Sequence, residues 1–413
     1  MDARDFVRRM WVLMLTVFVD MMGFLIVLPL LPFYAEKLGA SPFVVGALVS
    51  AFALAQLAVS PLWGRLSDRY GRRPMILGGL VISAVSYILF ESADAVWLLF
   101  LSRLVQGAGA GTVGVVQAYV SDSVPRNDRA KALGWLTAAT SAGVMVGPAL
   151  GSLSAGLGWV GPGYLAAGLC GLNFLFGLYW LPESVPRRDP SVNRQPAPSG
   201  GTRKVILTVL SRPFGPVGSL VWVYALGMMA FMAMNGVLAL YLERRFGVTV
   251  ATIGWFYVYV GAVSLVMRTV VLGPAVRRFG EVRTLRLGTL SMAIGLAACP
   301  LAGDFLQLAL AVLFVPVGTA LLFPTTTSQV SRKAPEGHTG LLLGVQQAFG
   351  GVSRMIGPLW AGAAFQHLGI RTPFFVAAGL MLAVRLLAQV IGEETDEHEA
   401  VPEVETAVPA EPT

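Results

Sequence analysis

Long apolar blocks dominate the chain and alternate with short connections that are polar or rich in glycine and proline. Four of the clearest blocks cover residues 10–34, 44–63, 217–242 and 306–323. Each is about as long as the ~20 residues with which an α-helix crosses a hydrocarbon core of roughly 30 Å. Core helices of soluble proteins are shorter and apolar on one side only. The pattern therefore predicts helices that span a membrane.

Breaking the hydropathy at the polar connections predicts twelve spans, with ends placed to about three residues. They cover residues 10–34, 43–63, 75–92, 95–119, 132–156, 162–181, 217–242, 251–272, 285–302, 305–328, 339–365 and 373–392. The first apolar stretch is too long for a cleaved secretion signal, and no small-residue cleavage site follows it. We therefore expect it to be retained as the first span.

Composition supports the same class. Of the 413 residues, 55% are hydrophobic and 13% are charged, about half the charged share of an ordinary soluble domain. So few charges cannot cover a surface that faces water.

The basic residues set an orientation. Nearly all those in connections fall on one side of the predicted spans, and only Lys37, Arg244, Arg245 and Arg371 fall on the other. The positive-inside rule then predicts that both termini are cytoplasmic, in a multi-pass protein of the inner (plasma) membrane. The net charge of +7 follows from basic loops beside anionic lipid, so no nucleic acid partner is needed.

An internal repeat divides the chain into two halves. The stretch GRLSDRYGRRP at 64–74 is echoed by GPAVRRFGEVR at 273–283, an offset of 209, and the Gly-Pro pair at 147–148 recurs at 357–358, an offset of 210. Six spans per half make the repeats parallel, which places a solute site between the halves near mid-membrane.

Four regions follow from this division. We predict an N-terminal six-helix bundle over residues 1–184 and a C-terminal bundle over 213–392. The segment 185–212 is rich in Pro, Ser, Gly and Arg and is expected to be a flexible cytoplasmic linker. The acidic segment 393–413 is expected to be disordered.

Four motifs resemble those of a known family. The loop GRLSDRYGRRP resembles the signature loop of the major facilitator superfamily. FVDMMGFLIVLPLLPFY at 18–34, RLVQGAGAG at 103–111 and SAGVMVGPALG at 141–151 resemble helix motifs of its twelve-span drug:proton antiporters, which include tetracycline and multidrug exporters. The resemblance covers about residues 12–392. It implies an all-α membrane protein of twelve helices in two pseudo-symmetric six-helix bundles, driven by a proton gradient without a cofactor.

One departure concerns the substrate. Tetracycline exporters typically carry acidic residues within spans three and nine, and spans 75–92 and 285–302 have none in their interiors. Tetracycline itself is therefore disfavoured.

Asp20 is the candidate proton-coupling residue. It lies about ten residues into the first span and is the one acid in the middle of any span, so it lies near mid-bilayer. A carboxylate there costs several kcal/mol unless it is paired, hydrated or protonated, which suits a group that loads and releases a proton. A permanently paired structural acid is the alternative.

Two arginines also lie deep in spans. The resemblance ties Arg103 in the fourth span to proton transfer, and we expect it to act on Asp20 or a nearby water, with a packing role as the alternative. Arg354 in the eleventh span either binds an anionic group of the solute or bridges to a backbone carbonyl.

The loop after the second span is the candidate conformational latch between the halves, by resemblance. Its residues are Gly64, Asp68, Arg69, Gly71, Arg72 and Arg73. Glycine permits a tight reversal, and Asp68 can pair with arginine or face a helix N-terminus. The second half has Arg277 in place of that acid, so the latch is expected to be asymmetric.

The fifth span carries the candidate antiporter motif. Gly143, Gly147 and Gly151 lie four residues apart on one helix face, and Pro148 frees a carbonyl group. Such a face allows close helix approach and bending. In the family this motif accompanies export.

The candidate substrate cavity is drawn from several spans. Its residues are Met228, Phe231, Met232, Asn235, Gln117, Gln346 and Arg354. Flexible thioethers adapt to varied apolar shapes, and the amides can hydrogen-bond a solute. Ordinary helix packing is the alternative for each.

Other classes are disfavoured. An ATP-driven pump needs Gly-Lys-Ser/Thr, and no lysine here precedes Ser or Thr. The three histidines are too scattered for a catalytic or metal site, and a repeat with latch loops describes rocking rather than a channel. We predict a monomeric proton-coupled exporter of hydrophobic drugs. The alternatives are a proton-coupled nutrient importer and a solute receptor that does not transport.

Overall fold

Helices make up almost all of the described chain. The computed structural model describes residues 3–124, 128–157, 161–183, 199–334 and 338–392. The first half comprises α1 (Ala3–Val27), α2 (Leu31–Lys37), α3 (Pro42–Tyr70), α4 (Arg72–Glu91), α5 (Val96–Gly109), α6 (Thr112–Ser123), α7 (Arg129–Leu157) and α8 (Pro162–Trp180). The second half comprises α9 (Ser199–Ser211), α10 (Pro216–Phe246), α11 (Val250–Val266), the π-helical η1 (Met267–Val271), α12 (Leu272–Ala298), the 3-10 turn η2 (Cys299–Leu301), α13 (Phe305–Arg332), α14 (Thr339–His367) and α15 (Thr372–Leu387).

Several predicted spans are built from more than one helix. The first span consists of α1 and α2, separated at Pro29, and the fourth consists of α5 and α6. Gly71 separates α3 from α4 with φ of 101°, and Gly280 bends α12 sharply with φ of 77°. Glycine adopts such positive φ without strain, so the same residue type ends a span at matching positions of the repeat.

The prediction of an all-α membrane protein is confirmed. Within the described residues, nine helical segments are long and apolar enough to cross a membrane, and one of them, Val250–Leu301, contains the bend at Gly280 and so holds two expected spans. The long helix α14 is not among the nine. Two glutamines, a serine and an arginine near its middle lower its mean hydropathy.

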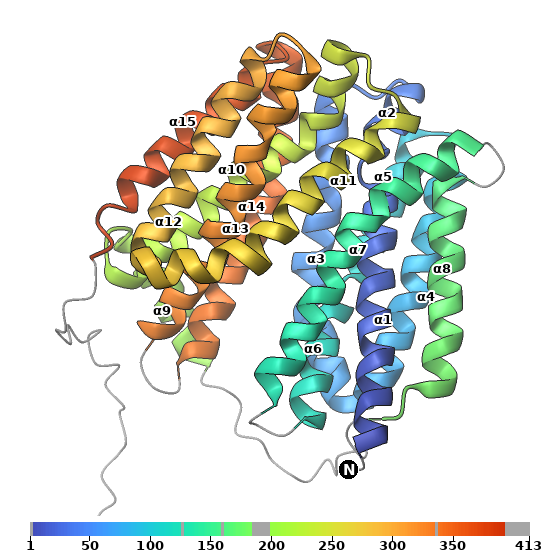
Figure 1. The fold of residues 1–413 in the computed structure, drawn as a ribbon. Helices are drawn as coiled ribbons and strands as arrows, with labels where there is room; N and C mark the ends of the chain where they lie inside the picture. Colours follow the sequence, from blue (N-terminus) through green and yellow to red (C-terminus); the bar gives the residue numbers. More distant parts are fainter. Residues whose placement is uncertain (1–2, 125–127, 158–160, 184–198, 335–337, 393–413) are drawn as a thin grey trace, which may run out of the picture.

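The two halves lie side by side, as Figure 1 shows. The largest contacts between them join α3 with α14 and α7 with α11. Helix α10 also contacts α2 and α3, and Arg244 Nη2 of α10 lies 2.7 Å from Glu36 Oε1 of α2. We call the end of the bundle where α3 begins the Pro42 end, and the end where α3 passes into α4 the Arg72 end. At the Pro42 end the Phe43 N–H donates to Gln366 Oε1 across the halves (3.2 Å).

The Arg72 end is different. Beyond Leu57, which packs on Gly351 of α14, most residues of α3 are exposed, including Ser60, Leu62 and Gly64. The halves are therefore closed at the Pro42 end and separated at the Arg72 end.

The segment between the halves differs from expectation. Helix α9 occupies much of the stretch 185–212 that was expected to be flexible. Val209 is buried against α10 and α14, and its carbonyl oxygen accepts a hydrogen bond from Trp222 Nε1 (3.2 Å). Apolar packing on the second half stabilises this helix. Residues 184–198 and the predicted disordered tail 393–413 lie outside the described residues.

Candidate functional site

The glycines of the antiporter motif allow α7 to touch the backbone of α1. A Cβ added at Gly143, Gly147 or Gly151 would lie 2.5–2.6 Å from a carbonyl oxygen of α1. The three oxygens belong in turn to Phe18, Met22 and Ile26. Real Cβ atoms do not come so close, so each position requires glycine and the two helices pack at backbone distance.

The proline of the same motif lies at the contact between the halves. A Cβ added at Gly254 of α11 would overlap the carbonyl oxygen of Pro148. Beside it, the Ser152 hydroxyl donates to the Val250 carbonyl oxygen and accepts from the Gly254 N–H, both at 2.8 Å. The proline therefore belongs to a tight junction of α7 with α11.

A matching junction joins the other helix pair. A Cβ added at Gly46 of α3 would overlap the carbonyl oxygen of Pro358 in α14. The two glycines differ by 208 positions and the two prolines by 210. We call these contacts, Gly254 with Pro148 and Gly46 with Pro358, the two Gly–Pro junctions; they close the Pro42 end in a pseudo-twofold arrangement.

Asp20 lines a small cavity inside the first half. The wall also includes Thr16, Leu80, Thr112 and Val116, and the space is roughly that of one water molecule. The carboxylate is partly buried, and no described residue forms an ion pair or a hydrogen bond with it. An acid with room for water beside it can exchange a proton.

Arg103 lies in a separate buried position. Its three guanidinium nitrogens have no hydrogen-bond partner among the described residues, and the guanidinium carbon lies 5.2 Å from the centre of the Phe90 ring. Within the described part of the chain, no ion pair joins Arg103 to Asp20. Tyr87 of α4 lies near both residues.

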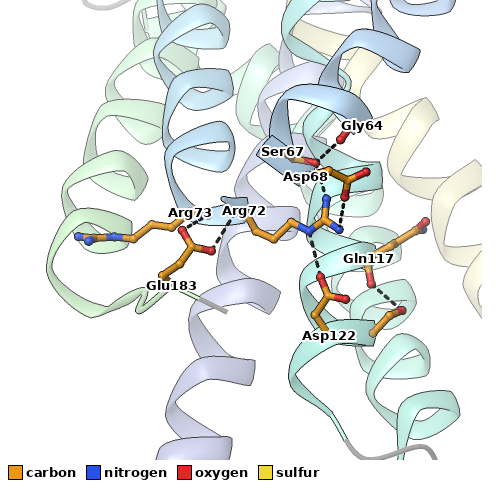
Figure 2. Close-up of polar contacts among 9 residues, drawn as sticks. Gly64, Ser67, Asp68, Arg72, Arg73, Gln117, Asp122 and Glu183 are labelled. Atoms are coloured by element: carbon orange, nitrogen blue, oxygen red, sulfur yellow. Dashed lines mark hydrogen bonds and ion pairs between the residues drawn. The ribbon is translucent and has the colours of Figure 1, made fainter. Parts of the chain in front are cut away.

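Arg72 is the centre of the candidate latch, shown in Figure 2. Its Nη2 lies 2.7 Å from Asp68 Oδ1, and its Nε lies 3.0 Å from Asp122 Oδ2 at the end of α6. Nη1 donates to the Ser67 hydroxyl (2.5 Å), which in turn donates to the Gly64 carbonyl (2.9 Å). The buried arginine therefore joins the ends of α3, α4 and α6.

Glu183, which follows α8, caps the start of α4. Its two carboxylate oxygens accept from the N–H groups of Arg72 (2.9 Å) and Arg73 (3.2 Å), and an acid at a helix N-terminus is favourable. A Cβ added at Gly71 would lie 2.6 Å from this carboxylate. The Arg73 side chain donates to the Leu178 carbonyl oxygen (2.5 Å).

Arg69 does not join this cluster. Its guanidinium lies 5.3 Å from the centre of the neighbouring Tyr70 ring, on the exposed end of α3.

The second half carries the same cluster with its charges inverted. Glu281 stands 209 positions after Arg72, and Arg332 stands 210 after Asp122. The Glu281 carboxylate accepts from Ser328 Oγ (2.8 Å) and Gln329 Nε2 (2.7 Å) and lies 3.3 Å from Arg332 Nη2. An anion here replaces the central cation of the first half.

The predicted cavity residues of the second half do not form one set. Phe231 belongs to a row of rings: its centroid lies 6.2 Å from that of Phe323, which lies 5.4 Å from that of Tyr224. Met228 is buried, and Met232 packs on Gly357 of α14. The Asn235 amide donates to the Phe231 carbonyl oxygen of its own helix (2.8 Å).

The predicted amides of α6 and α14 are also apart. Gln346 is fully buried and its Nε2 donates to Thr327 Oγ1 (3.4 Å). Gln117 lies on the exposed face of α6, where its backbone carbonyl oxygen accepts a hydrogen bond from the Ser121 hydroxyl (3.0 Å).

Sequence reasoning missed several residues that the structure brings into these contacts. Gly46 and Gly254 recur at nearly the repeat offset, and this signal was present in the sequence. Glu281 carries a signal of the same kind, a reversed charge at the position that matches Arg72. Ser152 and Tyr87 carry no sequence signal, since hydroxyl groups are common in apolar spans.

Known proteins resemble this chain over nearly its whole length. A family model described as Major Facilitator Superfamily matches residues 13–271 and 220–411. Multidrug resistance protein 2 of Bacillus subtilis is 28% identical over 94% of this chain and 96% of its own length. Tetracycline resistance protein, class G, of Vibrio anguillarum is 30% identical over 84% and 87%.

Solved structures show the same fold. The human organic anion transporter MFSD10 has a TM-score of 0.69 at 23% identity, covering 92% of this chain and 99% of its own. The nucleoside transporter NupG has a TM-score of 0.75 at 12% identity, covering 92% and 98%.

Proposed function

The chain belongs to the major facilitator superfamily and is a membrane transporter rather than an enzyme, and from this premise we propose that it exports hydrophobic or amphipathic drugs in exchange for protons. The curated relatives include multidrug, tetracycline and quinolone resistance proteins. One chain supplies both halves of the solute path, so the monomer is the working unit. It works in the inner membrane.

The proposed proton coupling rests on the surroundings of Asp20. This residue is an acid at mid-span with space for water beside it and no described partner. An acid with a permanent ion pair would be held in its charged form, whereas Asp20 is free to change charge as its surroundings change. Protonation of Asp20 favours the return of the empty carrier, and deprotonation favours the export step.

Alternating access follows from the two ends of the bundle. The distribution of basic residues supports a cytoplasmic Arg72 end, and in that orientation the state described above is open to the inside. Export requires that the Gly–Pro junctions part while the Arg72 end closes. Closure would bring Asp68 on α3 toward the start of α14, because these two helices already pair across the halves. The other large pair across the halves is α7 with α11, and α11 continues through η1 into the start of α12, which carries Arg277. Closure would therefore bring Arg277 toward Asp128, at the start of α7.

The test uses purified protein in proteoliposomes. A pH gradient is imposed and ethidium movement is followed for the wild type, Asp20→Asn and Asp94→Asn, the last being an exposed acid between α4 and α5 that serves as a matched control. We expect gradient-driven movement to be lost in Asp20→Asn alone, with unchanged insertion. Movement that stays gradient-dependent in Asp20→Asn would put the proton site elsewhere. No movement in any protein would indicate a porter of one specific solute.

A further inference from the structure

Arg354 lies at the middle of α14, between the two halves. One turn before it, Gly350 packs against the Tyr224 ring of α10, and Gly351 packs against Leu57 of α3. Residues three and four apart share a helix face, so Arg354 lies on the face of α14 that fronts both α10 and the first half. Gln347, two turns nearer the separated Arg72 end on that same face, is exposed. A solute that reaches Arg354 from this end would meet Gln347 first.

No described charge of the second half pairs with this arginine. Among the described residues none forms an ion pair or a hydrogen bond with Arg354, so the bridge to a backbone carbonyl considered from the sequence is not made. The second half has three described acids, and each lies near the end of a helical segment. Glu243 lies near the end of α10, Glu281 directly after the bend in α12, and Asp304 directly before α13. A cation at mid-span without a partner is costly, and an anion arriving with the solute would remove that cost.

The guanidinium lies near the Tyr224 ring, and polar and aromatic groups continue from this ring. Its Nη1 lies 3.7 Å from the point where a Cβ of Gly350 would stand, and that point is 2.6 Å from the Tyr224 ring. The Tyr224 hydroxyl is 3.3 Å from Gln347 Nε2 and 3.5 Å from its Oε1. Tyr224 begins the row of rings that continues through Phe323 to Phe231.

We propose that Arg354, with the Tyr224 hydroxyl, is a subsite for the carboxylate of an amphipathic aromatic substrate. The guanidinium fork matches two carboxylate oxygens, and the row of rings offers edges and faces to a flat apolar body. The inference rests on the proposed function and narrows it: the exporter prefers anionic or zwitterionic aromatic compounds over neutral compounds of the same shape.

The experiment compares two probes that share one ring system. Binding of 1-pyrenebutyrate and of the neutral 1-pyrenebutanol to purified protein is measured by fluorescence titration for the wild type, Arg354→Gln, Arg354→Lys and Arg268→Gln. Arg268 is an exposed span arginine of η1 with no described partner and serves as the control. We expect the wild type to bind the anion about tenfold more tightly than the alcohol. Arg354→Gln should abolish the preference, Arg354→Lys should retain part of it, and Arg268→Gln should leave it unchanged.

A second readout separates this inference from the proposed function. Gradient-driven ethidium movement by the wild type tests the proposed function alone, and recovery of monodisperse Arg354→Gln on size-exclusion chromatography shows that this variant folds. A preference for the anion that survives in Arg354→Gln, or equal binding of the two probes by the wild type, would overturn the subsite whether or not ethidium moves. Loss of ethidium movement in the wild type with an intact, Arg354-dependent preference would overturn the drug:proton exchange and leave the subsite standing.

Discussion

The Gly–Pro junctions make a quantitative prediction about the balance between the two conformations. In Gly46→Ala the added Cβ overlaps the carbonyl oxygen of Pro358 and lies 3.5 Å from the Cα of Gly362. The obstacle is backbone, which cannot rotate away as a side chain would. Overpacking of this kind costs about 1–3 kcal/mol. Only the state closed at the Pro42 end bears this cost, so the equilibrium should shift toward the opposite state by about 5- to 150-fold.

Cross-linking at the Pro42 end measures this shift. Phe43 and Gln366 face each other across the halves, and cysteines at these two positions can be joined by a short bismaleimide once Cys170 and Cys299 have been replaced by serine. We expect Gly46→Ala to lower the rate of cross-linking, because the rate follows the population of the closed state, and the decrease equals the shift in the equilibrium constant once the opposite state predominates. The control is Gly168→Ala, a helical glycine of α8 with nothing within 4 Å of an added Cβ, which corrects for the gain in helix propensity. Equal rates in the two variants would refute the reasoning, and Gly254→Ala should behave like Gly46→Ala.

Two further predictions concern stability. Gly147→Val places branched carbons against the Met22 carbonyl oxygen and Leu25, so it should abolish recovery of monodisperse protein. Gly134→Val, which has open space around it, should not. Recovery is measured by size-exclusion chromatography, and similar recovery of both variants would contradict the close packing of α1 on α7. Glu281→Gln can still hydrogen-bond Ser328 and Gln329 but loses the ion pair with Arg332. Because this pair is partly exposed, its loss should lower the free energy of unfolding by about 0.2–1 kcal/mol. Thermal unfolding of the single and double variants with Arg332→Gln gives the coupling energy, and purely additive losses would show that the pair is not stabilising.

The sequence by itself determined the class, the number of predicted spans and the repeat. Apolar blocks about 20 residues long are forced by the thickness of the bilayer, and a duplicated chain keeps its glycines and prolines at one offset. Gly143, Gly147, Gly151 and Asp20 stood out because small residues in register and an acid in hydrocarbon each need a reason to be there. Of the latch, the sequence showed the change of charge from Asp68 to Arg277, whereas the inverted pairs of Arg72 with Asp122 and of Glu281 with Arg332 emerged from the contacts.

Only the tertiary structure decided which helices meet and in which state. Hydropathy is the same for a helix face that meets lipid and for one that meets another helix. It therefore could not tell that Pro148 contacts α11 rather than bending α7 alone. It also could not tell that α9 packs on the second half. Nor could it tell that Arg103 lies over the Phe90 ring without an ion pair to Asp20, or that Arg354 lies near Tyr224. Distances between residues far apart in the chain depend on helix rotation and tilt, and these are set by packing between helices, which a one-dimensional pattern does not record.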